Sequence, residues 1–189
     1  MNLFLIGYRC TGKTSVGRFL AGVLGWGFID ADSELVKEHD MTIREIVARW
    51  GWNDFREKER IIIKKLCTLD RYVVATGGGA VLDDENVEGM KKSGVIVWLK
   101  ATPVTIKERI LRDKNTEEGR PALTDKGFLE EIEETLLSRN SHYHHAMDFF
   151  VDTNHRSIDE IGRTVIKKLN ALGIEEGKEP RLKRTGGSE

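Results

Sequence analysis

One segment near the start of the chain, Gly7-Tyr8-Arg9-Cys10-Thr11-Gly12-Lys13-Thr14, constrains the fold more than any other feature of the sequence. It fits the pattern Gly-x4-Gly-Lys-Ser/Thr. The apolar run Asn2–Ile6 before it predicts a buried strand, and Lys13–Leu24 after it carries apolar residues at helical spacing. In a strand–turn–helix unit of this kind, backbone N–H groups point into the turn and can bind phosphate oxygens. The segment therefore predicts a βα unit with an anion site at the turn.

The rest of the chain continues this alternation. Short apolar runs at 28–30, 72–75, 95–99 and 149–152 predict further strands. Helical periodicity occupies 33–38, 43–50, 54–67, 104–111, 129–139 and 158–169. Strands that alternate with helices favour right-handed crossovers and a parallel sheet covered on both faces. We therefore expect an α/β fold in three layers, with about five strands and ligands beyond their carboxyl ends.

Composition narrows the class of protein. The 189 residues are enough for one domain, which we place at 1–173, with a polar, aperiodic tail at 174–189. The formal net charge of -1 argues against a nucleic-acid binder, because no basic excess exists to release counterions. No apolar run approaches the roughly 20 residues of a membrane span. Cys10 and Cys67 form no CxxC pair, so a reducing cytoplasm is the expected location.

The glycine-rich turn has the residues of a nucleotide-phosphate loop, or P-loop. Lys13 is expected to reach the β- and γ-phosphates, and the Thr14 hydroxyl is expected to bind Mg²⁺. The chain has no Asn-Lys-x-Asp segment of the kind that reads guanine, which disfavours a GTPase. The predicted phosphate contacts come from the loop and the first helical turn: Gly7, Cys10, Thr11, Gly12, Lys13, Thr14 and Ser15.

Two carboxylates, Asp30 and Asp32, follow the second predicted strand. At a strand end both can approach a metal–phosphate centre, one near the metal and the other beside a nucleophilic hydroxyl. Phosphoryl transfer depends mostly on such positioning and on charge stabilisation. The alternative for Asp32 is a purely local role as the cap of the following helix.

Arginines and a glycine run supply further candidates. Arg56 and Glu59 are spaced to pair on a helix, which would hold the guanidinium for bidentate recognition of a carboxylate; a solvated surface pair is the alternative. Gly77-Gly78-Gly79 follows a strand and would let backbone approach a ligand, or form only a tight turn. Arg120 lies in a polar segment that could close over a phosphate, and Arg139 ends a helix, where the dipole alone would explain it.

Taken in order, these motifs resemble the shikimate kinase family over residues 1–172. The resemblance implies a P-loop NTPase fold of the nucleoside-monophosphate-kinase type with a lid near 113–125. It implies ATP and Mg²⁺ as cofactors, shikimate as substrate, no nucleic acid, no membrane, and a monomer. It also implies roles for single residues. The phosphate and Mg²⁺ would be bound by Lys13 and Thr14, and Asp30 would assist the metal. Asp32 would be the base that contacts the substrate hydroxyls, and Arg120 would come from the lid. The carboxylate and backbone contacts would come from Arg56, Arg139, Gly78 and Gly79, and the adenine contacts from Arg112 and Arg156.

The sequence departs from this family at two points. Cys10 stands where the family usually has glycine, and Arg139-Asn-Ser-His-Tyr143 lacks the usual Pro-Leu. Two other functions stay open: another small-molecule kinase such as a gluconate kinase, and a nucleotide-binding regulator without transfer chemistry. Asp32 and Arg56 favour shikimate over gluconate, and intact Lys13 and Arg120 disfavour the regulator.

Overall fold

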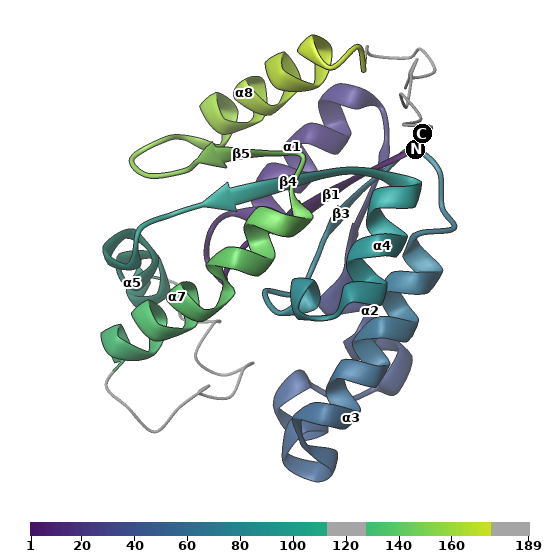
Figure 1. Ribbon diagram of the computed structural model, residues 1–189, viewed down its shortest axis with the longest axis vertical. Coiled ribbons are helices and arrows are strands. Elements are labelled where there is room, and N and C mark those ends of the chain that lie inside the picture. The colour runs from purple at the N-terminus through teal and green to yellow at the C-terminus, as the bar shows by residue number, and fades with distance from the viewer. Residues whose placement is uncertain (113–127, 175–189) are drawn as a thin grey trace, which may run out of the picture.

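The computed structural model describes residues 1–112 and 128–174, which form a parallel sheet between two layers of helices (Figure 1). The sheet has five strands in the order β2-β3-β1-β4-β5, and every neighbouring pair is parallel. The three-layer α/β prediction is therefore confirmed. The strands are β1 (Asn2–Ile6), β2 (Gly27–Asp30), β3 (Tyr72–Ala75), β4 (Gly94–Lys100) and β5 (Phe149–Asp152).

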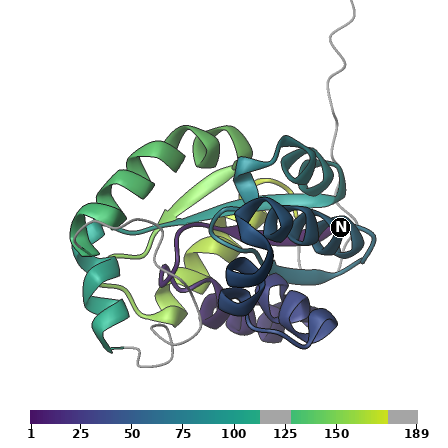
Figure 2. The same ribbon diagram turned by 90° about the horizontal axis from the view of Figure 1, so that it is seen from below.

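Helices connect the strands and cover both faces of the sheet. They are α1 (Lys13–Leu24), α2 (Ala31–His39), α3 (Ile43–Leu66), α4 (Asp84–Ser93), α5 (Pro103–Arg112), α7 (Phe128–Ala146) and α8 (Ile158–Ala171), with a short 3₁₀ turn at Ala80–Leu82. In Figure 1, α8 lies above the sheet and α4 and α3 lie below it. Figure 2 shows α1, in purple, on the opposite side of the sheet from α7, in green.

The alternation of side chains along the strands builds one core on each face. Leu3 and Leu5 of β1 pack with α1 and α8, whereas Phe4 and Ile6 pack with α2, α3 and α4. Continuous apolar strands are typical of a parallel sheet buried on both faces. These two cores fix the strand ends, and so the loops that carry the site.

The predicted helices agree with the structure at one break and differ from it at two other places, each for a local reason. The predicted break near residue 51 is real, because Gly51 has φ 84° and kinks α3. Helix α7 runs on to Ala146 instead of ending near 139, since Tyr143 and Ala146 are buried on its inner face. The sequence analysis missed α4, which buries only Asn86, Val87 and Met90 and so has little periodicity.

Two predicted segments fall outside the description of the structure. The predicted lid at 113–125, with Arg120, lies outside the described residues, as does the predicted tail from residue 175 onward. Ile174, which we assigned to the tail, is buried against the core between the sheet and α8. Within the described residues, no helix is both long enough and apolar enough to cross a membrane.

Candidate active site

The phosphate-binding loop joins β1 to α1 at the carboxyl edge of the sheet. Gly7 and Gly12 adopt positive φ angles of 139° and 98°, which only glycine takes without strain. The ammonium group of Lys13 donates hydrogen bonds to the carbonyls of Gly7 and Tyr8, both at 2.8 Å. Thr11 Oγ1 also donates to the Tyr8 carbonyl, at 2.8 Å. The loop is thus held in a closed turn by its own side chains, with the lysine folded across it.

A hydroxyl at the start of α1 meets a carboxylate at the end of β2. Thr14 Oγ1 donates to Asp30 Oδ2 at 2.7 Å, and Asp30 Oδ1 accepts from the backbone N–H groups of Asp32 and Ser33. Asp30 is therefore the residue that caps α2, so the capping role considered for Asp32 belongs to its neighbour. Mg²⁺ prefers oxygen donors of this kind, and Thr14 with Asp30 fits such an ion.

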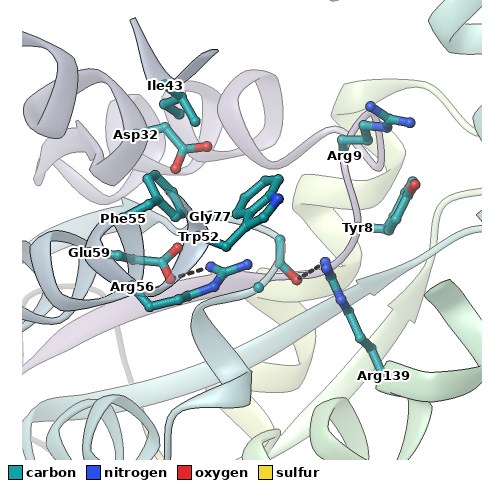
Figure 3. Close-up of a pocket in the computed structure, with 12 residues that line it drawn as sticks. Tyr8, Arg9, Asp32, Ile43, Trp52, Phe55, Arg56, Glu59, Gly77 and Arg139 are labelled. Carbon is teal, nitrogen blue, oxygen red and sulfur yellow. Dashed lines mark hydrogen bonds and ion pairs between the residues drawn. The ribbon is translucent and has the colours of Figure 1, made fainter. Parts of the chain in front are cut away.

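A pocket open to solvent lies beside the loop and includes the glycine segment, Gly77–Gly79. Figure 3 shows Arg56 and Arg139 approaching this segment from opposite sides. Its wall is made by the phosphate loop, α2, α3, the glycine segment and α7. The lining residues are Tyr8, Arg9, Asp32, Ile43, Trp52, Phe55, Arg56, Glu59, Gly77, Gly78, Gly79 and Arg139. The structure thus brings together Asp32, Arg56, Gly78, Gly79 and Arg139, which were selected from separate parts of the sequence.

Arg56 is fixed in this pocket by a buried partner. Its Nη1 donates to Glu59 Oε2 at 2.5 Å, one turn along α3. Its guanidinium carbon also lies 5.7 Å from the Trp52 ring centroid and 5.1 Å from that of Phe55. The pair is not the solvated surface pair considered as an alternative, because the Glu59 side chain is only 3% exposed. A guanidinium held this way keeps its planar fork for an incoming carboxylate.

Glu59 and Asp32 lie close together behind the glycine segment. A Cβ on Gly77 would lie against Glu59 Oε1 and 2.8 Å from Asp32 Oδ1, so only glycine leaves room for both carboxylates. Burial raises the pKa of the Glu59 carboxyl; the Arg56 guanidinium lowers it, and the negative charge of Asp32 raises it further. The pocket therefore holds two neighbouring carboxylates in different environments.

Helix α7 contributes the second arginine and a tyrosine. Arg139 Nη1 donates to the Gly78 carbonyl at 3.1 Å, and the Tyr143 hydroxyl donates to the same oxygen at 2.6 Å. Burial raises the pKa of Tyr143 to about 12, so its hydroxyl stays a donor at neutral pH. The missing Pro-Leu between these residues does not displace Arg139, because the helix runs through the segment without a break.

A second pocket lies on the other side of the loop, at the N-terminal end of α1. It is lined by Cys10, Ser15, Arg109 and Arg156 among others. Arg112, expected beside adenine, does not line it: it is the exposed last residue of α5, while Arg109 enters the wall instead. Arg109 donates to the Thr153 carbonyl at 2.5 Å and to the Cys10 carbonyl at 3.2 Å.

Sequence reasoning missed two further residues as functional candidates: Arg9, which lines the first pocket, and Tyr143, which donates to the Gly78 carbonyl beside it. Trp50 and Trp52 lie close to Arg56 in the sequence, so either could line a substrate pocket; the structure puts Trp52 in the pocket and leaves Trp50 43% exposed at the surface. Tyr143 carried a usable signal, because it lies one helical turn after Arg139 and so shares its face. Arg9 carried none, since it occupies one of the four unspecified positions of the Gly-x4-Gly-Lys-Ser/Thr pattern.

The phosphate loop, the hydroxyl–carboxylate pair beside it and the adjoining polar pocket define a P-loop kinase fold for a small acceptor. The family model for shikimate kinases matches residues 9–170. The chain belongs to the shikimate kinase family.

Individual relatives agree with this assignment. The chain is 41% identical to a shikimate kinase of Syntrophus aciditrophicus (strain SB) over 90% of its own length and 91% of the relative's. It is 40% identical to one of Thermodesulfovibrio yellowstonii, over 90% and 96% of the two chains. The solved shikimate kinase from Acinetobacter baumannii in complex with shikimate is 29% identical, with a TM-score of 0.85 over 92% of this chain and 95% of that one.

A gluconokinase from Sinorhizobium meliloti matches less well. It is 16% identical with a TM-score of 0.58, over 90% of this chain and 92% of that one. This likeness shows a common fold alone, and the gluconate alternative is not favoured.

Proposed function

We propose that this enzyme transfers the γ-phosphate of Mg²⁺-ATP to the 3-hydroxyl of shikimate, giving shikimate 3-phosphate and ADP. The observation that carries the proposal is the pocket in which Arg56 and Arg139 flank the glycine segment, with Asp32 beside it and the phosphate loop adjoining. Two guanidinium groups suit the carboxylate of shikimate, and a carboxylate with exposed backbone groups suits its hydroxyls.

Each side chain has a separate task in this reaction. Arg56, held by Glu59, and Arg139 bind the substrate carboxylate and so turn the ring toward the phosphate loop. Asp32 accepts the proton of the attacking hydroxyl, and Lys13 leaves its carbonyl partners to neutralise charge on the transferring phosphate. Thr14 and Asp30 would hold Mg²⁺, which supplies positive charge at the phosphate oxygens when it is bound.

The remaining expectations extend this proposal. Gly7, Cys10, Thr11, Gly12 and Ser15 bind the phosphates, while Arg156, with Arg112 or Arg109, contacts the adenine. Arg120 closes over the phosphate from a lid at 113–125 of a single domain, 1–173. We infer that the enzyme acts as a monomer in the cytoplasm, where ATP is supplied. The support for a monomer is that the side chains proposed to bind shikimate, Asp32, Arg56 and Arg139, all come from one chain.

The direct test is an assay of ADP release with shikimate, gluconate and nucleoside monophosphates as acceptors. We expect turnover with shikimate alone, with the phosphate found on the 3-hydroxyl by ³¹P NMR. The variant Arg56→Lys should raise the KM for shikimate far more than that for ATP, because lysine lacks the bidentate fork.

A matched control is Arg163→Lys. Arg163 pairs with Asp159 at 2.8 Å on the exposed side of α8, so this change should alter neither KM. Turnover with gluconate instead of shikimate, or equal effects of Arg56→Lys on both substrates, would contradict the proposal. Sedimentation of the enzyme as a dimer would contradict the monomer.

A further inference from the structure

The phosphate loop is tied to α7 by an ion pair that the reaction scheme above does not use. Arg9 Nη2 donates to Glu131 Oε1 at 2.8 Å, across 122 residues of chain. The side chains are 12% and 3% exposed. Removing water from two charges costs several kcal/mol per ion before their attraction is counted. A buried ion pair of this kind often adds no net stability to a fold. Stabilisation alone therefore does not explain why this pair lies between the phosphate loop and α7.

Apolar contacts join the same two elements. Tyr8, the neighbour of Arg9, is buried in a small core with Ile132 of α7, and Cys10 and Leu136 pack against it. Arg9 thus contacts α7 directly, and its two neighbours in the loop belong to the small core that includes Ile132 of α7. A movement of the loop backbone would therefore press on the helix, since packed side chains leave little free space.

The same face of α7 reaches the substrate pocket two turns later. Glu131 and Arg139 are eight residues apart, so they lie on one face of the helix. At that end Arg139 and Tyr143 both donate to the Gly78 carbonyl. Helix α7 is therefore fastened to the phosphate loop at one end and to the glycine segment at the other.

We propose that Arg9 and Glu131 are positioning residues that couple nucleotide binding to shikimate binding through α7. Nucleotide phosphates fix the backbone of the loop, and with it Arg9; Glu131 then holds α7 in the one position in which Arg139 reaches the substrate carboxylate. This inference rests on the proposed function. The coupling is reciprocal, so shikimate strengthens nucleotide binding by the same factor.

The test compares the Kd of shikimate, measured by calorimetry, without nucleotide and with a saturating non-hydrolysable ATP analogue and Mg²⁺. The ratio of the two values is the coupling factor, for which 5- to 150-fold is the usual range. The variants are Glu131→Gln, Arg9→Met and the double variant R9M/E131Q. The double variant leaves no buried charge unpaired, so it keeps the test valid if either single variant unfolds.

We expect the wild type to show coupling, and each single variant to reduce the coupling factor at least fivefold. The double variant should reduce the coupling factor no further than the single variants do. For Glu131→Gln, the Kd of shikimate without nucleotide should change less than about twofold, because Glu131 does not line the pocket. The control is Asp159→Asn, which breaks the exposed Arg163–Asp159 pair on α8 and should leave the coupling factor unchanged.

Two results would overturn the inference. An unchanged coupling factor in a less stable variant would mean that the pair only supports the fold. An equal loss of shikimate affinity with and without nucleotide would make Arg9, which lines the pocket, a direct substrate contact. Absence of shikimate binding by the wild type would instead refute the proposed function itself.

Discussion

Gly79→Ala should disable substrate binding while leaving the fold intact. Gly79 has φ −109° and ψ 3°, a backbone conformation open to alanine, so the glycine is needed only for the close approach of another group. That group is the Arg56 guanidinium: an added Cβ would lie 2.6 Å from its Cζ and Nη1. The alanine methyl would occupy the space in which the guanidinium is held.

The size of the effect follows from these distances. Ordinary contact begins at 3.4 Å, so Cζ and Nη1 must move by about 0.8 Å, the difference between 3.4 and 2.6 Å, and Nη2, which would lie closer still, must move further. A misplacement of about 1 Å can cost on the order of 10²-fold in rate, or about 2.7 kcal/mol. The obstructed atoms end a flexible side chain, and alanine restricts the unfolded chain, so the free energy of unfolding should change by less than about 1 kcal/mol.

Steady-state kinetics with shikimate and ATP varied separately measure this effect. We expect kcat/KM for shikimate to fall about 100-fold, with the KM for ATP unchanged. The matched control is Gly22→Ala in α1, where a Cβ would meet no heavy atom within 4 Å. That change should leave both KM values alone and stabilise the helix by about 0.5–1 kcal/mol. A KM for shikimate within threefold of wild type in Gly79→Ala would refute the role given to Arg56.

Three further predictions concern single side chains. Asp32→Asn should lower kcat by roughly 10²–10⁴-fold with ATP binding intact in calorimetry, because it removes the proton acceptor; near-normal turnover would leave Asp32 without that role. Cys10→Gly should raise the free energy of unfolding, measured in urea, by about 0.5 kcal/mol. The φ of 59° at Cys10 costs a residue with a Cβ roughly 1–2 kcal/mol, and the greater chain entropy of unfolded glycine offsets only part of that gain. A decrease in the free energy of unfolding would contradict this. Burial raises the pKa of Glu59, so its contribution to stability is complete below the unfolded pKa of about 4.3 and is lost as pH rises through the folded value. The stability of wild type relative to Glu59→Gln should therefore fall as the pH rises above about 4.3, and a difference in urea unfolding that does not change with pH would exclude this effect.

The parts of the site that follow strands directly could be predicted from the sequence. The phosphate loop, Asp30 and Asp32, and Gly77–79 each come immediately after an apolar run, and parallel strands bring their carboxyl ends to one edge. Arg56 could be selected because its partner Glu59 is one helical turn away. Local spacing is sufficient in each of these cases.

Contacts that depend on how helices pack could not be predicted. Arg9 and Glu131 are 122 residues apart, and neither has a local pattern that marks the other as its partner. Arg109 and Arg112 share one helix, and the burial of Ile106 and Ile110 decides that Arg109 is the arginine that lines the second pocket. The choice between the two arginines depends on how α5 packs on the sheet, and the periodicity of the α5 segment does not predict that packing.

The strand order also governs how the chain acquires its structure. β1 is made first, yet it pairs with β3 and β4: Leu3 lies opposite Val73 on one side and Val95 on the other. Loop closure over such sequence separations makes parallel sheets slow to form. During synthesis β1 therefore stays without a strand partner until about seventy residues have followed it, and its apolar side chains remain unburied by the sheet during that interval.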